Sequence, residues 1–163
     1  MNQRYKLDYE SPIGVMELIS TEDAVCSITF SERTKPLNLR KKDTPAVLTD
    51  CYKELDEYFK GTRRKFSVPF LFEGTDFQKK VWTALTKIPY AETCSYKDIA
   101  ASIGNEKAVR AVGMTNGKNK ISIIVPCHRV IGANGKLTGY AGGLWRKEWL
   151  LEHERSGIHL FDE

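Results

Sequence analysis

The 163 residues of this chain suffice for one ordinary domain or two small ones, and a hydrophobic fraction of 41% is typical of a protein that buries a core. No run of about 18 apolar residues occurs, which argues against a membrane span, and the polar N-terminus lacks the apolar core of a signal peptide, so we expect a cytoplasmic protein. The net charge of +4 is uneven: residues 1–74 are neutral, whereas residues 75–155 carry 13 Lys and Arg against 7 Asp and Glu, which favours a polyanionic partner for the second half.

The first half of the chain is predicted to form a sheet and one helix. Alternating apolar and polar residues predict strands over residues 5–9, 15–20 and 24–30. A helical stripe starts near Thr44 and stops at Gly61. A short strand around residues 66–68 and a linker follow, and we place a domain boundary after Gly74. Residues 1–74 are thus expected to form an N-terminal sheet-and-helix domain.

The second half, residues 75–163, is predicted to be mainly helical, which makes the whole chain an α+β protein. Apolar stripes and stop signals predict helices over residues 75–88, 95–103, 106–115 and 144–155. Ser95 and Asp98 have the spacing of a capping box, and a tight turn at Gly104 separates two short helices, as in a helix-turn-helix. The last helix should end at Gly157. Its inward-facing residues should include Leu144, Trp145, Trp149 and Leu150.

The four cysteines of the chain, at positions 26, 51, 94 and 127, include no Cys-x-x-Cys pair. Zinc sites and redox pairs that can be recognised from sequence need such close spacing, so we expect no metal site. In a reducing cytoplasm all four should be free thiols. A buried cysteine is usually a small hydrophobic residue, so any reactivity must be argued from its neighbours.

The segment Pro126-Cys127-His128-Arg129 is the most informative part of the sequence. A free cysteine has a pKa of ~8.5, so a reactive thiol needs a base or a nearby positive charge, and His128 offers a base beside Cys127. Neighbouring side chains on a strand point to opposite faces, so this pair needs a turn or a bridging water. A Cys-His dipeptide alone is a weak signal, because it often arises by chance.

A third group should orient the imidazole of His128 for proton transfer. Carboxylates on the predicted last helix are the candidates, namely Glu148, Glu152 and Glu154. From the residues alone, all three stay open.

Several further motifs occur in order along residues 75–157. They are Ser95-Tyr96-Lys97-Asp98-Ile99-Ala100, Ala108-Val109-Arg110-Ala111-Val112-Gly113, Ile124-Val125-Pro126-Cys127-His128-Arg129-Val130-Ile131, Gly139-Tyr140-Ala141-Gly142-Gly143-Leu144 and Lys147-Glu148-Trp149-Leu150-Leu151-Glu152-His153-Glu154. In order and separation they resemble the methylated-DNA–protein-cysteine methyltransferases, which repair 6-O-alkylguanine. The first 74 residues match more weakly, chiefly through Ser11-Pro12-Ile13-Gly14, and are similar to the variable N-terminal sheet domain of that family.

The resemblance implies a single, irreversible transfer of a methyl or larger alkyl group from 6-O-alkylguanine in DNA to the protein's own cysteine. Cys127 would be the acceptor, His128 would activate it through a water molecule, and Glu154 would hold the histidine. Tyr96 would donate a proton to nitrogen 3 of the departing guanine. Asn119 would be the hinge between the recognition helix and the active-site segment. No metal or other cofactor would be needed.

The same resemblance implies contacts with double-stranded DNA and with a flipped base. The DNA contacts would come from Tyr96, Arg110, Ala111, Gly113 and Arg129. Arg110 would enter the base stack where the target leaves, since an alkylated oxygen inside a duplex is reached only by flipping the base. The guanine edge would be read by backbone groups at Cys127, Val130, Tyr140 and Ala141. Many members of the family carry Ser where this chain has Ala141, which leaves the range of accepted alkyl groups open.

Other interpretations are weaker but testable. A non-catalytic alkylation-damage sensor would bind the same lesion without an acceptor cysteine, whereas this chain has Cys127. A helix-turn-helix regulator would usually dimerise to match two half-sites, and no dimerisation helix is evident, so we expect a monomer. A Cys/His hydrolase would need an oxyanion site that the sequence does not show.

Overall fold

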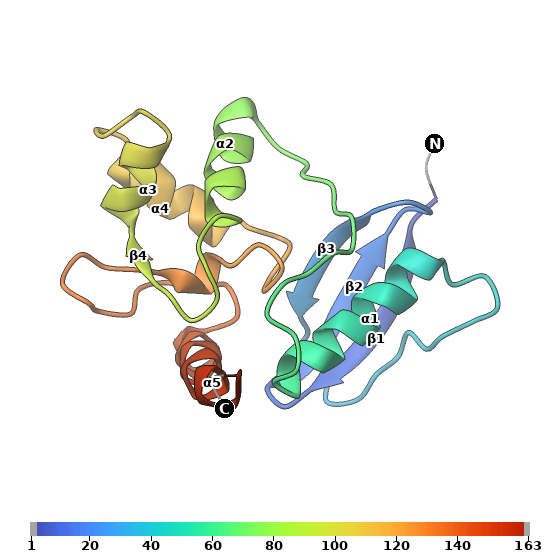
Figure 1. Cartoon of the computed structure of the whole chain (residues 1–163). Helices are drawn as coiled ribbons and strands as arrows, with labels where there is room; N and C mark the ends of the chain where they lie inside the picture. Colours follow the sequence, from blue (N-terminus) through green and yellow to red (C-terminus); the bar gives the residue numbers. More distant parts are fainter. Residues whose placement is uncertain (1–2, 162–163) are drawn as a thin grey trace. The chain divides into compact units, whose positions relative to one another are not determined.

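A computed structural model of the chain describes residues 3–161, with side chains up to residue 157. The chain divides into two compact units, Met1–Phe72 and Glu73–Glu163 (Figure 1), just before the boundary expected at Gly74. The first is a small sheet with a helix and the second is mainly helical, which confirms the predicted α+β class. Within residues 3–161, no helix is both long enough and apolar enough to cross a membrane.

An antiparallel sheet forms the body of the first unit, as predicted. Its strands are β1 (Tyr5–Ser11), β2 (Gly14–Ser20) and β3 (Val25–Phe30), in that order across the sheet. The tight turn between β1 and β2 uses Gly14, whose φ of 121° disfavours any residue with a Cβ. Helix α1 (Ala46–Phe59) lies along one face of the sheet (Figure 1). The core between them includes the fully buried side chains of Leu18, Ile28, Leu48 and Leu55.

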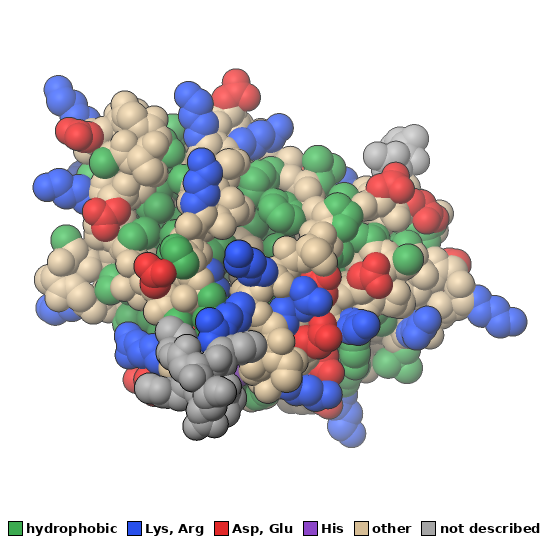
Figure 2. Space-filling model, viewed as in Figure 1, with side chains coloured by type: hydrophobic (Ala, Val, Ile, Leu, Met, Phe, Trp, Pro, Cys, Tyr) green, Lys and Arg blue, Asp and Glu red, His purple; other side chains and the backbone are tan. Residues whose placement is uncertain are grey.

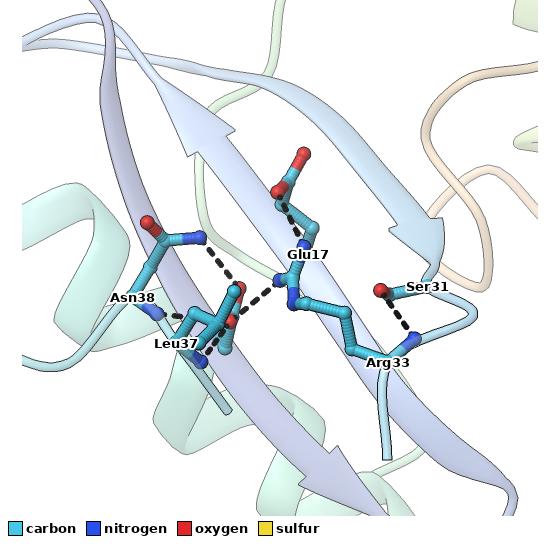
Figure 3. Close-up of polar contacts among 6 residues, drawn as sticks. Glu17, Ser31, Arg33, Leu37 and Asn38 are labelled. Atoms are coloured by element: carbon cyan, nitrogen blue, oxygen red, sulfur yellow. Dashed lines mark hydrogen bonds and ion pairs between the residues drawn. The ribbon is translucent and has the colours of Figure 1, made fainter. Parts of the chain in front are cut away.

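The polar loop between β3 and α1 is anchored to the sheet by Asp8, whose side chain is fully buried. Its carboxylate accepts hydrogen bonds from the amides of Leu37 (2.8 Å) and Asn38 (3.0 Å) and from Asn38 Nδ2 (3.1 Å) (Figure 3). Arg33 Nη2 donates to the same carboxylate at 2.6 Å, and Arg33 Nη1 lies 3.4 Å from Glu17. Burial alone would raise the pKa of Asp8, but these hydrogen bonds hold it below its usual value.

The strand expected around residues 66–68 does not form. The amides of Ser67 and Val68 donate instead to the carboxylate of Glu54, at 2.9 and 3.2 Å, and the Ser67 hydroxyl does so at 2.6 Å. The chain reaches the sheet only at Phe70, which forms a bridge to Val25. The predicted strand is absent because a side-chain carboxylate, rather than a neighbouring strand, accepts these backbone donors.

Helices and a short parallel sheet build the second unit. They are α2 (Asp76–Leu85), β4 (Cys94–Ser95), α3 (Tyr96–Ser102), α4 (Val109–Gly117), β5 (Val130–Ile131) and α5 (Leu144–Phe161). The predicted capping box of Ser95 and Asp98 starts α3, and a second box, of Thr75 and Gln78, starts α2. A capping box provides hydrogen bonds for the free backbone N–H groups at the start of a helix. Because its two residues are only three positions apart, the sequence alone can predict it.

Helices α3 and α4 form the expected helix-turn-helix, with Gly104 in the left-handed region at a φ of 75°. Helix α4 begins at Val109 rather than near residue 106. The preceding residues form a turn instead, in which the Ala108 amide donates to the Asn105 carbonyl at 3.0 Å.

Helix α5 begins at Leu144, as predicted, but its end and its buried face differ from the prediction. Gly157 lies inside the helix, which continues to Phe161. An added Cβ at Gly157 would lie 2.5 Å from the Tyr90 hydroxyl oxygen, so the glycine permits close packing rather than ending the helix. Leu144 and Trp145, expected to face inward, are 48% and 57% exposed. The buried face of the helix is formed instead by Lys147, Leu150, Leu151 and Glu154.

Candidate active site around Cys127

Cys127 lies at the start of a buried turn. Residues 121–125 are buried without forming a strand, and Ile123 has a positive φ of 72°, which is strained for a β-branched residue. One turn of 3-10 helix, η1 (Cys127–Arg129), follows directly. The bend that a neighbouring Cys-His pair requires is therefore present.

Two asparagines hold this bend in place. Asn119 Nδ2 donates to the carbonyls of Val125 (2.8 Å) and Ile121 (3.3 Å), and Asn119 Oδ1 accepts the Ile121 amide (3.0 Å). Asn116, near the end of α4, donates from Nδ2 to the Cys127 carbonyl at 3.4 Å. The family motifs predict a role for Asn119 but not for Asn116, although a polar residue on the apolar stripe of α4 was a usable signal.

Glu154 fixes the imidazole of His128. Both side chains are fully buried, and His128 Nε2 lies 2.7 Å from Glu154 Oε2. Because a carboxylate can only accept, Nε2 carries the ring proton and Nδ1 has the lone pair. Among the described residues, Nδ1 has no hydrogen-bond partner. Burial lowers the pKa of His128 although Glu154 opposes this, so the ring is a neutral base at neutral pH. The other two candidate carboxylates, Glu148 and Glu152, are exposed.

Arg129 is buried in the same cluster, which corrects its expected contact with DNA. Its Nε and Nη2 donate to the Glu154 carboxylate at 2.8 and 3.1 Å, and Nη1 donates to the Ile88 carbonyl at 2.7 Å. The Ala91 amide also donates to Glu154, at 3.1 Å. Burial favours the neutral acid, but His128 and Arg129 hold the pKa of Glu154 well below its usual range. A guanidinium engaged in this way orders the carboxylate and cannot reach the surface.

Cys127 is buried, with only 5% of the residue exposed. Burial raises its pKa, while the Asn119 side chain and the positive charge of Lys147 act in the opposite direction. The resting group is therefore a neutral thiol, which needs a base before it can act as a nucleophile. Within the described part of the chain, no cluster of three or more His, Cys, Asp or Glu side chains could hold a metal ion.

Lys147 is a buried cation that the sequence analysis missed. Its Nζ donates to the carbonyls of Val130 (2.6 Å) and Thr138 (2.9 Å), and none of the residue is exposed. Burial lowers the pKa of Lys147 to about 8, and the neighbouring thiolate opposes this shift. A signal was available, because Lys147 shares one helical stripe with Leu150 and Glu154.

The predicted DNA-contacting residues of the helix-turn-helix fall into two groups. Tyr96, the first residue of α3, is half-buried, and its hydroxyl oxygen lies 2.6 Å from Thr138 Oγ1. Gly113 on α4 lies beside it, since an added Cβ would be 3.8 Å from the Tyr96 ring. Arg110 and Ala111 are exposed on α4. The structure thus brings Tyr96 and Gly113 together and leaves Arg110 and Ala111 on the helix surface.

The loop between β5 and α5 contains the residues expected to read the base. Val130 is buried at its start, and Ala141 is exposed and offers no hydroxyl. Burial raises the pKa of Tyr140 well above its usual value, and the charge of a Cys127 thiolate acts in the same direction.

A separate groove of 830 Å³ lies against α2 and α3. Figure 2 shows Lys and Arg side chains gathered along α2, and Lys79, Lys80 and Lys87 contribute to the groove wall. Cys94 also lines it, but burial raises the pKa of that thiol to about 11, and the described lining contains no histidine. Cys94 therefore lacks the neighbouring base that distinguishes Cys127.

These features define a helix-turn-helix protein in which a buried thiol is followed directly by a histidine–glutamate pair. Residues 76–156 match the DNA binding domain of 6-O-methylguanine DNA methyltransferase, and residues 4–72 match the ribonuclease-like domain of the same proteins. The chain belongs to the 6-O-methylguanine DNA methyltransferase family.

Similar proteins match over nearly the whole chain. The methylated-DNA–protein-cysteine methyltransferase of Methanosarcina acetivorans is 47% identical, over 93% of this chain and 99% of its own length. The constitutive methylated-DNA–protein-cysteine methyltransferase of Bacillus subtilis is 45% identical, over 93% of this chain and 95% of its own. The crystal structure of Mycobacterium tuberculosis OGT in complex with DNA has a TM-score of 0.84, with 45% identity over 94% of both chains.

Proposed function

We propose that the chain repairs DNA by moving a methyl or larger alkyl group from the 6-oxygen of guanine to the sulfur of Cys127, once and irreversibly. The observation that carries the proposal is the buried thiol followed by His128, whose Nε2 is fixed 2.7 Å from Glu154. Membership of the 6-O-methylguanine DNA methyltransferase family supports the same reaction. The chain provides the acceptor cysteine that a damage sensor would lack.

The first chemical step is removal of the thiol proton. His128 Nδ1 has the available lone pair and accepts this proton through a bridging water molecule. Glu154 stabilises the imidazolium that forms, as buried carboxylates do for catalytic histidines. The positive charge of Lys147 stabilises the thiolate.

The transfer itself is a displacement at the alkyl carbon. The sulfur of Cys127 forms a bond to that carbon as the carbon–oxygen bond breaks, and the electron pair stays with guanine. Tyr96 donates its phenolic proton to nitrogen 3 of the departing base, which makes guanine a better leaving group. The product is a thioether that no group of the site can cleave, so each molecule reacts once.

The lesion must leave the duplex before it can reach a buried thiol, and flipping a base costs a few kcal/mol. Arg110, exposed on α4, fills the gap that the base leaves, while Ala111 and Gly113 allow the helix to approach the DNA closely. Backbone groups of Cys127 and of the residues Val130, Tyr140 and Ala141 read the guanine edge. The Val130 carbonyl retains a second lone pair for this contact besides the one that Lys147 occupies.

The partner is therefore double-stranded DNA that contains alkylated guanine, and one copy of the chain provides every group that the reaction uses. A monomer is sufficient. A reaction that requires chromosomal DNA and a reduced thiol belongs in the cytoplasm.

The deciding experiment is intact mass spectrometry after incubation with a duplex that contains 6-O-methylguanine. We expect one added methyl group, mapped to Cys127 by peptide analysis. Cys127→Ala should bind the same duplex without a change of mass. Tight binding by the unsubstituted chain without a mass change would identify a damage sensor instead, and transfer that persists in Cys127→Ala would exclude Cys127 as the acceptor.

A further inference from the structure

Thr138, in the loop between β5 and α5, is held from two sides by residues of the candidate site. Its hydroxyl oxygen lies 2.6 Å from the Tyr96 hydroxyl oxygen, and either atom can be the donor. Its carbonyl accepts a hydrogen bond from Lys147 Nζ at 2.9 Å. Tyr96 begins α3 and Lys147 belongs to α5, so this one loop residue connects two helices that both contribute to the site.

Lys147 also connects the Thr138 loop to the segment that contains the Cys127 thiol. The same ammonium donates to the Val130 carbonyl at 2.6 Å, directly after the 3-10 turn that contains Cys127. Its charge acts on the Cys127 thiol as well. The position of the Thr138 hydroxyl, and therefore of the Tyr96 phenol that it contacts, is fixed relative to the reacting sulfur.

We propose that Thr138 is a positioning residue for alkyl transfer: its hydroxyl aims the Tyr96 phenol and donates a hydrogen bond to the phenolic oxygen as that group gives up its proton. This inference rests on the proposed function. In the resting protein the pair shares one hydrogen bond, in either direction. When Tyr96 turns its own proton toward the substrate, Thr138 is left as the donor to Tyr96.

The protons and charges of this step balance. As the sulfur–carbon bond forms and the carbon–oxygen bond breaks, the phenolic proton moves to nitrogen 3 of guanine. The negative charge left on the Tyr96 oxygen is stabilised by the Thr138 hydroxyl until solvent returns a proton. A hydrogen bond to an ionised oxygen is roughly twice as strong as one between neutral groups, so Thr138 favours the transition state over the resting state.

The loop does not depend on the Thr138 hydroxyl for its shape. Its tight turn is closed by backbone hydrogen bonds from the Gly132 amide to the Lys136 carbonyl (2.9 Å) and from the Gly135 amide to the Gly132 carbonyl (2.8 Å). The contact with Lys147 uses the carbonyl of Thr138 rather than its side chain. Substitution of the side chain therefore leaves these interactions intact.

The test compares Thr138→Val, which has a similar shape but no hydroxyl, with Thr138→Ser, which retains one. Thr93→Val, at an exposed threonine before β4, is the matched control. Single-turnover rates are measured on two duplexes with the same alkyl group, one on guanine and one on a purine analogue that is more acidic. The analogue leaves readily without protonation, so its transfer depends less on Tyr96.

We expect Thr138→Val to slow transfer from guanine roughly 10-fold and transfer from the acidic analogue less than about 2-fold. Thr138→Ser and Thr93→Val should match the unsubstituted chain on both duplexes. In a Tyr96→Phe background, Thr138→Val should have no further effect, because the two residues act through one proton. Equal slowing on both duplexes, no slowing on either, or an additive effect in the Tyr96→Phe background would each overturn the proposal. Failure of the proposed function is distinguishable, because then the unsubstituted chain would transfer nothing.

Discussion

Each unit of the chain contains a buried carboxylate held by an arginine, and the second carboxylate also contacts an imidazole. Asp8 on β1 is surrounded by permanent donors, namely the guanidinium of Arg33 and N–H groups of the loop that it anchors (Figure 3). Glu154 on α5 likewise binds a guanidinium, that of Arg129, and a backbone amide. A further partner is the imidazole of His128, a group that can accept a proton during a reaction.

Because of this difference, Asp8 has only a structural role, whereas Glu154 also takes part in the proposed chemistry. Burial opposes ionisation of both carboxylates, yet their hydrogen-bond partners hold both pKa values below the usual ranges, so both are anions at neutral pH. Around Asp8 that charge can only order a loop. Around Glu154 it also sets the tautomer of His128 and leaves Nδ1 as a base beside a thiol. The same arrangement of a buried acid and an arginine thus has two uses in one chain.

The largest effect should follow from Glu154→Gln, which retains the size of the side chain but removes its charge. We expect the transfer rate to fall by at least about 10²-fold, because the base loses the group that stabilises its protonated form. The free energy of unfolding should fall by roughly 3–5 kcal/mol, since Arg129 is left buried without its anion. Single-turnover kinetics and urea denaturation measure the two effects.

Glu152→Gln, on the exposed side of the same helix, is the control and should change neither the transfer rate nor the stability. A rate within about 3-fold of normal for Glu154→Gln would remove its chemical role.

Asp8→Asn should affect stability alone. Its carboxylate has several hydrogen bonds but a partly exposed arginine partner, so we expect a loss of about 2–3 kcal/mol in urea denaturation. Once the variant is folded, its transfer rate should equal that of the unsubstituted chain. A folded Asp8→Asn protein with a reduced rate would show that the two carboxylates are less different than their partners indicate.

The sequence predicted those parts of the site that depend on near neighbours. The capping box of Ser95 and Asp98 and the Cys127–His128 pair were found because their members lie within a few residues of each other. From the residues alone, Glu154 could not be separated from Glu148 and Glu152. Its position on the buried stripe of α5 does separate them, but the sequence analysis also placed Leu144 and Trp145 on the inward face, and the structure shows both of them exposed.

Several of the errors come from contacts between residues far apart in the sequence. Arg129 was expected at the DNA surface, but Glu154, 25 residues later, holds it in the interior. Gly157 has the local signature of a helix end, yet its lack of a side chain accommodates Tyr90. Lys147 was overlooked because a lysine is rarely buried unless other groups satisfy its charge and its N–H donors.

A smaller effect concerns pH and Lys147. Its pKa of about 8 means that the ammonium beside the thiol loses its charge in mildly alkaline solution. The transfer rate should therefore fall roughly 3–10-fold as the pH rises through about 8, because the thiolate loses a stabilising charge. In Lys147→Met this fall should be absent, although the rate at pH 7 is lower. The measurement is the single-turnover rate from pH 6 to pH 10, and parallel profiles for the two proteins would argue against the assignment.

The lowered pKa of Lys147 also determines how the free energy of unfolding changes with pH. The folded protein holds the Lys147 proton less tightly than the unfolded chain, whose lysine has the usual pKa of 10.5. The unfolded state therefore binds more protons between pH 8 and 10.5, and the contribution of Lys147 to stability rises with pH across that window. Urea denaturation should show the unsubstituted chain gaining stability relative to Lys147→Met in this window. A constant difference would contradict the lowered pKa.

The smallest effect is that of Gly157→Ala, and its sign distinguishes local propensity from packing. Helix propensity alone predicts a gain of about 1 kcal/mol for alanine inside a helix. The added Cβ would lie 2.5 Å from the Tyr90 hydroxyl oxygen, and the Tyr90 ring in turn lies under the Arg129 guanidinium, at 5.7 Å. We therefore expect a net loss of about 1 kcal/mol, because a well-packed site must shift to accept the methyl group. Gly117→Ala, at the end of α4, is the matched control, since nothing lies within 4 Å of its added Cβ, and it should be neutral or stabilising. If both variants gained stability, the packing that links Tyr90 to the cluster around Glu154 would be looser than the structure indicates, and Glu154 would be held, like Asp8, by its direct partners alone.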